Sequence, residues 1–238
     1  MEFFIFMVII FLASILQTST GFGFSILATP FLLLLFQPME AIQINLILSL
    51  VISCALIAKI RKDIDMGILK RFVLGSLPGL LLGIYIFLAM DINGLKLAVS
   101  LIILVLTVLL IGRWRLRQTK KRDLAIGGLS GAFTTSIGMP GPPLLLYFSG
   151  TNTIKETLRA TTLGYYLFIY FASLIVQIIF AGTNQTVWLS SLWALPVVGI
   201  GLVAGQWWFK KMSPRFFQVL TYLLLIFTGI YLLLESIR

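Results

Sequence analysis

The stretch Gln17-Thr-Ser-Thr-Gly-Phe-Gly23 interrupts an otherwise apolar run that extends from Phe3 to Phe36. A second polar, glycine-rich interruption, Thr134-Thr-Ser-Ile-Gly-Met-Pro-Gly-Pro-Pro143, follows 117 residues later. Where a helix breaks at membrane depth, its backbone must be surrounded by protein or by a water-filled cavity. Two matched breaks therefore indicate one shared site.

The composition is that of an integral membrane protein. Of the 238 residues, 59% are apolar and 11% are charged, and the mean hydropathy is +1.06. The length allows about eight helical segments of roughly 20 residues with short loops. The chain has a single cysteine, Cys54, and no histidine. Neither a disulfide framework nor a Cys/His metal site is predicted, and no cofactor is expected.

Hydropathy predicts six helices that cross the bilayer once, at about 41–58, 68–90, 95–112, 154–181, 187–209 and 216–234. The two interrupted runs, 3–36 and 124–149, have arms of about 12 to 16 residues. An α-helix of that length measures roughly 18 to 24 Å, which is short for a hydrocarbon core of roughly 30 Å. Each interrupted run is predicted to be a hairpin that enters the membrane and returns.

The basic residues predict the topology. Of the 18 basic residues, 16 fall in four loop clusters: Lys59, Arg61, Lys62, Lys70 and Arg71; Arg113, Arg115, Arg117, Lys120, Lys121 and Arg122; Lys155 and Arg159; Lys210, Lys211 and Arg215. All four clusters are cytoplasmic if residues 124–149 enter and leave on the same side, as the positive-inside rule favours. Both termini then lie on the outer side. The net charge is +10. Because the basic residues lie in loops between apolar segments, we interpret this charge as a signal of membrane topology and not of nucleic-acid binding.

The same topology predicts an all-α polytopic membrane protein made of two inverted repeats. Residues 1–112 form the first repeat, 113–123 a basic cytoplasmic linker, and 124–238 the second repeat. Each repeat is a hairpin followed by three transmembrane helices, and three crossings make the halves antiparallel. Short local matches support the duplication: Glu40-Ala-Ile-Gln43-x-Asn45 lies over Glu156-Thr-Leu-Arg159-x-Thr161, and Leu77-Pro78 over Leu195-Pro196.

The residues at the two breaks suit an anion. The second arm of each hairpin is predicted to begin at Phe22–Phe24 and at about Pro140–Pro143, so that two helix N-termini, each with unpaired N–H groups and a partial positive charge, point at the site. The candidate substrate-binding residues are hydroxyl, glycine, amide and guanidinium groups: Thr18, Ser19, Gly21, Gly23, Gln43, Asn45, Thr135, Ser136, Gly138, Gly141 and Arg159. The alternative is that these small residues only allow tight helix packing.

Arg159 is the strongest single candidate. Thr153-Ile-Lys-Glu156 matches a capping box, which would start a helix and place Arg159 about one and a half turns into the membrane. A fixed guanidinium can bind an oxyanion through two hydrogen bonds. The alternative is that its side chain reaches the headgroups.

Other features have structural interpretations. Gly75-x-x-x-Gly79-x-x-x-Gly83, Gly127 to Gly131 and Gly201-x-x-x-Gly205 are predicted to be helix-packing faces. None of the eight acidic residues is predicted near the centre of a span, so the carboxylate relay of many proton-driven transporters is not predicted. The coupling ion, H+ or Na+, stays undetermined.

Two signatures carry a family resemblance. The first half has Gly21-Phe-Gly-Phe-Ser-Ile-Leu-Ala-Thr-Pro30, then Pro38-x-Glu-Ala and Asn45; the second has Gly127-Gly-Leu-Ser-Gly131, Gly138-Met-Pro-Gly-Pro-Pro143 and Arg159-Ala-Thr161. Over essentially its whole length the chain resembles the sulfite exporter TauE/SafE family, also called the toluenesulfonate uptake permease family. The resemblance implies a permease of the cytoplasmic (inner) membrane for small, often sulfur-containing anions, and no enzyme.

The sequence favours a secondary transporter that works by alternating access, in contact with a small anion and the lipid bilayer. A homodimer is left open, as are the substrate and the direction of transport. One rival is a cation or metal transporter, which would need intramembrane Asp, Glu, His or Cys ligands. Another is a non-transporting membrane subunit that assembles with a soluble partner through residues 113–122. A membrane enzyme is the third.

Overall fold

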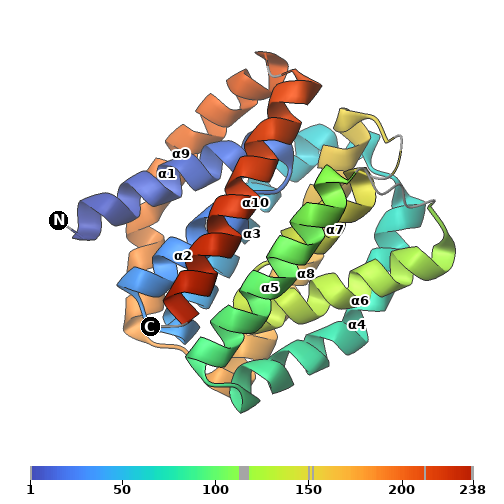
Figure 1. The fold of residues 1–238 in the computed structure, drawn as a ribbon. Coiled ribbons are helices and arrows are strands. Elements are labelled where there is room, and N and C mark those ends of the chain that lie inside the picture. Colours follow the sequence, from blue (N-terminus) through green and yellow to red (C-terminus); the bar gives the residue numbers. More distant parts are fainter. Residues whose placement is uncertain (1, 113–117, 150, 152, 212, 237–238) are drawn as a thin grey trace.

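The computed structural model describes residues 2–236 with the exception of 113–117, 150, 152 and 212. The regular structure of the described residues is entirely helical, which confirms the predicted all-α fold class (Figure 1). The elements are α1 (Glu2–Thr20), α2 (Phe24–Leu35), α3 (Pro38–Ile60), a 3-10 turn (Arg61–Asp63), α4 (Met66–Ala89), α5 (Ile92–Ile111), α6 (Lys120–Ile137), α7 (Gly141–Ser149), α8 (Lys155–Ala181), α9 (Gln185–Lys211) and α10 (Pro214–Ser236). Part of the predicted basic linker, 113–117, lies outside the described residues.

Five helices of the described chain are long and apolar enough to cross a membrane: α1, α3 with its 3-10 extension, α4, α8 and α9. Four of them match predicted single spans. The fifth, α1, corrects the prediction of two short arms in the first interrupted run, because α1 has 19 residues and measures about 28 Å at about 1.5 Å per residue. In the second run, α6 has 18 residues and α7 only 9.

The first arms are longer than predicted because their polar residues do not end the helix. The Ser19 and Thr20 hydroxyls donate to the carbonyls of Ile15 and Leu16, one turn earlier, at 2.7 and 2.6 Å. Hydroxyls satisfied in this way are compatible with a continuing helix. The start of α6 is extended by Thr119, whose side chain accepts from the amide of Arg122 at 3.3 Å. The charged residues after Thr119 are therefore helical.

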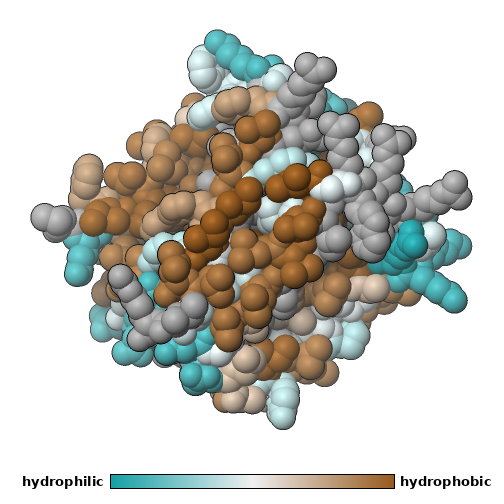
Figure 2. Space-filling model, viewed as in Figure 1, coloured by the Kyte–Doolittle hydropathy of each residue, from teal (hydrophilic) through white to brown (hydrophobic). Residues whose placement is uncertain are grey.

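Large apolar side chains cover much of the outer surface. Figure 2 shows hydrophobic residues across most of the visible face, with hydrophilic residues gathered at its periphery. Trp193 and Trp207 are 65% and 62% exposed, as expected for residues that face lipid or its interface. An exposed apolar surface of this extent is typical of a protein in a bilayer.

Glycine pairs bring two sets of helices into close contact. A Cβ atom on Gly75 or Gly79 of α4 would lie 2.1 Å from a carbonyl oxygen of α6, that of Leu124 or Gly128. On α9, a Cβ at Gly205 would lie 2.6 Å from the Cβ of Thr18 on α1. The predicted packing faces are therefore confirmed, because no larger residue fits there without moving a helix.

The helix contacts follow a regular exchange between the halves of the chain. The α1 helix packs on α9, and α6, which is five α-helices after α1, packs on α4, which is five α-helices before α9. In Figure 1 these pairs lie on opposite sides of the molecule, at the upper left and lower right. Two more contacts repeat in the second half in the same way: α2 packs on α10 as α7 packs on α5, and α3 packs on α9 as α8 packs on α4. Three further contacts join helices that occupy equivalent places in the two halves, namely α2 with α7, α3 with α8 and α5 with α10.

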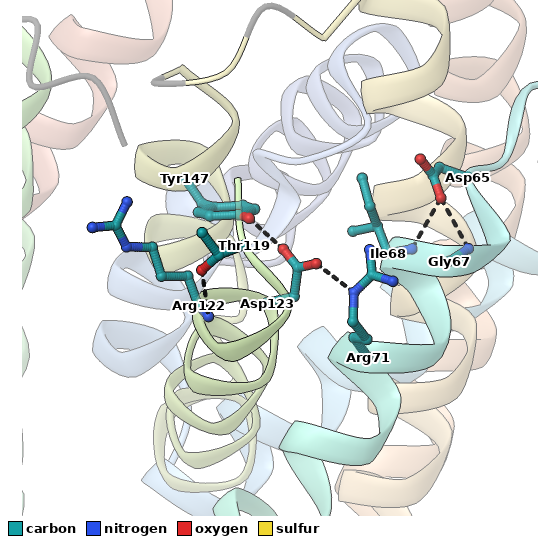
Figure 3. Close-up of polar contacts among 8 residues, drawn as sticks. All are labelled: Asp65, Gly67, Ile68, Arg71, Thr119, Arg122, Asp123 and Tyr147. Carbon is teal, nitrogen blue, oxygen red and sulfur yellow. Dashed lines mark hydrogen bonds and ion pairs between the residues drawn. The ribbon is translucent and has the colours of Figure 1, made fainter. Parts of the chain in front are cut away.

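A buried carboxylate ties the short helix α7 to its neighbours (Figure 3). Asp123, in the first turn of α6, is fully buried and pairs with the Arg71 Nε of α4 at 2.5 Å. The Tyr147 hydroxyl of α7 donates to its other oxygen. Asp123 is the one buried residue among the eight acids, all of which are described. In the sequence Asp123 is the last residue of the predicted linker, 113–123. In the structure Asp123 belongs to the first turn of α6, and it does not lie at the centre of a span.

Candidate functional site

The first break consists of Gly21 and Gly23, which both have positive φ angles, 86° and 118°. A residue with a Cβ rarely adopts such a conformation. Thr20 stabilises the turn, since its hydroxyl accepts from the amide of Phe22 at 3.1 Å. The second arm then begins at Phe24, as predicted. Gly23 is the N-cap of α2 and supplies no side-chain acceptor for the first amides of the helix.

The second break has the same character. Gly138 ends α6 with φ of 72° and α7 begins at Gly141, which confirms the predicted position of the second arm. Two side chains hold the connecting backbone: Ser130 donates to the carbonyl of Pro140 at 2.9 Å, and Asn45 of α3 donates to that of Gly138 at 2.7 Å. A residue of the first half thus binds the break of the second half.

The helices that follow the two breaks meet at their first turns. A Cβ atom on Gly141 would lie 3.2 Å from the side chain of Ile26 on α2 and 3.2 Å from the hydroxyl of Tyr166 on α8. Two helix N-termini therefore lie close together, and each carries a partial positive charge of up to about half a unit. Tyr166 lies near the middle of α8, which runs from Lys155 to Ala181.

Arg159 contacts the first break. Its Nε donates to the carbonyl of Thr18 at 2.8 Å, and its Cα would be 2.9 Å from a Cβ on Gly21. The guanidinium lies 4.3 Å from the ring centroid of Phe209. Arg159 is only 7% exposed, its Nη2 has no hydrogen-bond partner, and no acid of the described chain pairs with it. A buried cation is left without a full counter-charge.

The capping box predicted for this helix is wrong. The N-cap of α8 is Ile154, which makes no side-chain cap, while the Thr153 hydroxyl lies 2.7 Å from that of Thr151. Arg159 is therefore the fifth residue of α8. A capping box is present on α3 instead, between Gln37 and Glu40.

The hydroxyl residues of the breaks occupy two environments. Thr18 packs against Gly205 of α9, and Thr135 packs against Gly83 of α4. The Thr18 hydroxyl has no partner, whereas that of Thr135 lies 3.0 Å from the hydroxyl of Ser173. Ser19 and Ser136 instead donate to carbonyls one turn earlier in their own helices. Of these candidates, only Thr18 keeps a free hydroxyl.

Gln43 lies away from Arg159, although the two occupy matching positions in the sequence. Its amide nitrogen donates to the carbonyl of Gly182 at 2.7 Å, at the opposite end of α8. The structure thus brings Arg159 to the first break and Asn45 to the second. The side-chain amide of Gln43 binds neither break and instead donates to Gly182.

Arg159 is the first member of a polar stripe on α8 whose other residues are not among the candidates predicted from the sequence. Its members are all buried and follow one another at helical spacings of three and four residues: Arg159, Thr162, Tyr166, Tyr170, Ser173 and Gln177. The Tyr166 and Tyr170 rings are 4.8 Å apart. The spacing alone was a sufficient signal, because polar residues at three and four within an apolar helix define one face.

Several polar atoms near this stripe have no hydrogen-bond partner in the described structure. They include the hydroxyls of Ser25, Ser49, Thr162, Tyr166 and Tyr170 and the carbonyl oxygen of the Asn45 side chain. The Tyr170 hydroxyl faces those of Ser25 on α2 and Ser49 on α3. An unpaired buried polar atom costs about 1–3 kcal/mol, and such atoms usually bind water or a ligand. Their grouping beside two helix N-termini marks a candidate binding region.

This region is made of hydroxyl, amide and guanidinium groups. Among the described residues there is no group of three His, Cys, Asp or Glu side chains that could hold a metal ion. Most of the groups present can donate hydrogen bonds, and the one charge among them is positive. The chemistry fits a small oxyanion.

A comparison with protein families decides the classification. The model of the family described as "Sulfite exporter TauE/SafE" matches residues 6–232. The chain belongs to this family. The family match and the apolar helices identify a multi-pass membrane transporter of the sulfite exporter type. No curated protein and no solved structure matched this TauE/SafE family member.

Proposed function

We propose that this chain is a secondary transporter that moves a small oxyanion, with sulfur oxyanions as its substrate class, across the cytoplasmic membrane. The observation that carries the proposal is the buried guanidinium of Arg159, which has an unpaired Nη2 and no acid partner in the described chain. The family supports the substrate class, since its description names sulfite.

Electrostatics explain why an anion fits. Removing one guanidinium from water costs several kcal/mol unless it is paired. The carbonyl of Thr18 belongs to the C-terminal turn of α1, which offers about half a negative charge at most. A bound oxyanion would supply the remainder through the free Nη2. It would also be attracted by the N-termini of α2 and α7.

The proposed mechanism is alternating access between two inverted repeats, 1–112 and 124–238. The proposal is supported by the helix contacts, which repeat between the two halves when each helix of one half is compared with the helix five places away in the other half. The breaks also exchange partners, because Arg159 binds the first break and Asn45 the second. The basic clusters orient both termini toward the outer side. Rocking of one repeat against the other would expose the site to each side in turn.

The test is uptake of labelled sulfite by proteoliposomes that contain the purified chain. Arg159→Ala should abolish uptake, and Arg159→Lys should retain only part of it, because a lysine lacks the two-pronged geometry. Lys155→Ala is the matched control: Lys155 lies one turn earlier and over the same ring of Phe209, but it is exposed and lies 3.7 Å from Glu156. Lys155→Ala should transport normally.

The rivals predict other results. A wild-type chain that moves neither sulfite nor a sulfonate in liposomes would contradict the proposal and favour a non-transporting subunit. Uptake of a cation without any anion would favour the cation transporter. Equal rates for Arg159→Ala and wild type would remove Arg159 from the site.

A further inference from the structure

Two tyrosines of α8 lie where the two broken segments meet. Tyr166 and Tyr170 are fully buried. The Tyr166 hydroxyl has no hydrogen-bond partner in the described structure, and the Tyr170 hydroxyl makes no hydrogen bond of ordinary geometry there, although the hydroxyls of Ser25 and Ser49 lie near it. The Tyr166 hydroxyl is 3.2 Å from the Cβ position of Gly141, the first residue of α7. The Tyr170 hydroxyl faces Ser25, in the first turn of α2. Each helix N-terminus therefore has one phenol beside it.

Packing alone does not account for the two hydroxyls. A phenylalanine would fill the same space without placing an unpaired polar atom in the interior. The neighbouring Tyr165 shows the contrast, because its hydroxyl donates to the carbonyl of Gly127 at 3.3 Å. Tyr165 is equally buried, so the difference lies in the partner and not in burial.

We propose that Tyr166 and Tyr170 form a second anion station without a formal charge, deeper in the protein than Arg159. They follow Arg159 by 7 and 11 residues on one helix, or about 10 and 16 Å along its axis. The station takes a compact oxyanion with at least two oxygens, one for each phenol donor. This inference rests on the proposed function and extends it from one site to two successive sites.

The surroundings favour an anion over a cation. The N-terminal ends of α2 and α7 point toward the station and are positive. No carboxylate is close, since Asp123 is the one buried acid and it is bound to Arg71 and Tyr147. A phenol is also a good donor toward an oxyanion. Na+ would instead need several oxygen acceptors directed at one point.

A neutral station has a mechanistic advantage. An anion held only by a buried guanidinium would leave slowly, and transport requires that each site bind firmly enough to fill and weakly enough to empty. Phenols and helix N-termini bind an anion more weakly than Arg159 does. The pair can therefore receive the anion from Arg159 and release it onward.

The experiment compares Tyr166→Phe, Tyr170→Phe and Tyr165→Phe in proteoliposomes and in detergent. Two quantities are measured: the KM for sulfite uptake, and the melting temperature with and without sulfite. We expect a KM at least tenfold higher in Tyr166→Phe and Tyr170→Phe, with the melting temperature of the sulfite-free protein unchanged or raised. Tyr165→Phe should lower that melting temperature and leave the KM unchanged.

Three results overturn the station. The first is a wild-type KM in both Tyr166→Phe and Tyr170→Phe; the second is an equal rise of the KM in Tyr165→Phe. The third is sulfite uptake that Na+ activates in the wild type but not in Tyr166→Phe or Tyr170→Phe, with the KM for sulfite unchanged; this result would make the phenols ligands of a cation. If Arg159→Ala abolishes uptake while both tyrosine variants transport normally, only the station fails. If the wild type neither binds nor transports sulfite or a sulfonate, the proposed function fails and the station with it.

Discussion

Arg159 and Gly21 are in direct contact, with the Arg159 Cα only 2.9 Å from the position that a Cβ on Gly21 would occupy. The φ angle of Gly21 is 86°, so the position disfavours any side chain on conformational grounds as well. We expect Gly21→Ala to destabilise the fold by more than about 1 kcal/mol and to displace Arg159. Sulfite uptake should fall more steeply than stability, as measured by transport and by melting temperature on one preparation.

Gly199→Ala is the control for this substitution. Gly199 lies inside α9 with a normal helical φ, and no atom lies within 4 Å of its Cβ position. Because alanine favours the helix by about 1 kcal/mol over glycine, Gly199→Ala should be neutral or stabilising and should transport normally. A Gly21→Ala protein with wild-type stability and transport would show that the contact with Arg159 does not matter.

Asn45→Leu tests the contact between the first half of the chain and the second break. The Asn45 amide donates to the carbonyl of Gly138 at 2.7 Å in a fully buried position. Leucine has the same branched side-chain skeleton, with two methyl groups in place of the amide, and leaves that carbonyl unpaired at a cost of about 1–3 kcal/mol. We expect a lower melting temperature and reduced uptake. Gln206→Ala, which removes an exposed hydrogen bond of equal length from Lys59, should change stability by less than about 0.5 kcal/mol.

The sequence predicted the positions of the breaks because glycine and proline have strong local effects. Gly21, Gly23 and Gly138 adopt conformations that other residues avoid, and α7 begins at Gly141, just before two prolines. A proline in the first turn of a helix needs no hydrogen bond for its nitrogen. Local chemistry of this kind is readable without knowledge of the fold.

Helix lengths and side-chain partners were harder to predict. The polar run Thr18–Thr20 resembles the end of a helix in the sequence, but α1 continues through it because the Ser19 and Thr20 hydroxyls bond within their own helix. The sequence gives Gln43 and Arg159 equivalent positions in the two repeats but not their partners, which are the carbonyl of Gly182 for Gln43 and that of Thr18 for Arg159. Long-range partners depend on how helices cross, which one sequence does not specify. The tyrosine pair, by contrast, was visible in the helical spacing of α8.

Asp123→Asn tests the link between α4, α6 and α7. An asparagine keeps an oxygen that can accept from Tyr147 but loses the ion pair with Arg71. Because the Arg71 side chain is 26% exposed, its charge can partly reach solvent, and we expect a loss of about 1–3 kcal/mol, which is less than for a fully buried pair. Asp123→Leu, which also removes the acceptor for Tyr147, should destabilise more. Unfolding in detergent measures both.

The exposed pair of Lys155 and Glu156, 3.7 Å apart, gives the comparison. Glu156→Gln should change stability by less than about 0.5 kcal/mol, since exposed ion pairs contribute little. Equal effects of Asp123→Asn and Glu156→Gln would mean that the ion pair with Arg71 adds no stability, and equal effects of Asp123→Leu and Glu156→Gln would mean that the buried carboxylate does not hold α7 in place.

Gly79→Ala tests the close packing of α4 on α6. A Cβ on Gly79 would lie 2.1 Å from the carbonyl oxygen of Gly128, which is a backbone atom and cannot move without its helix. We expect α4 and α6 to separate and the melting temperature to fall, with a cost of about 1–3 kcal/mol as for other overpacked sites.

Gly128→Ala, on the same interface, is the matched substitution for Gly79→Ala. The nearest atom to its Cβ position is the Gly75 carbonyl oxygen at 3.3 Å, so a shift of a few tenths of an ångström accommodates the methyl group. Gly128→Ala should therefore be much less destabilising than Gly79→Ala, although both replace a glycine by the better helix former. If the two variants melt at the same temperature, the distance between the helix backbones does not limit the stability of this pair.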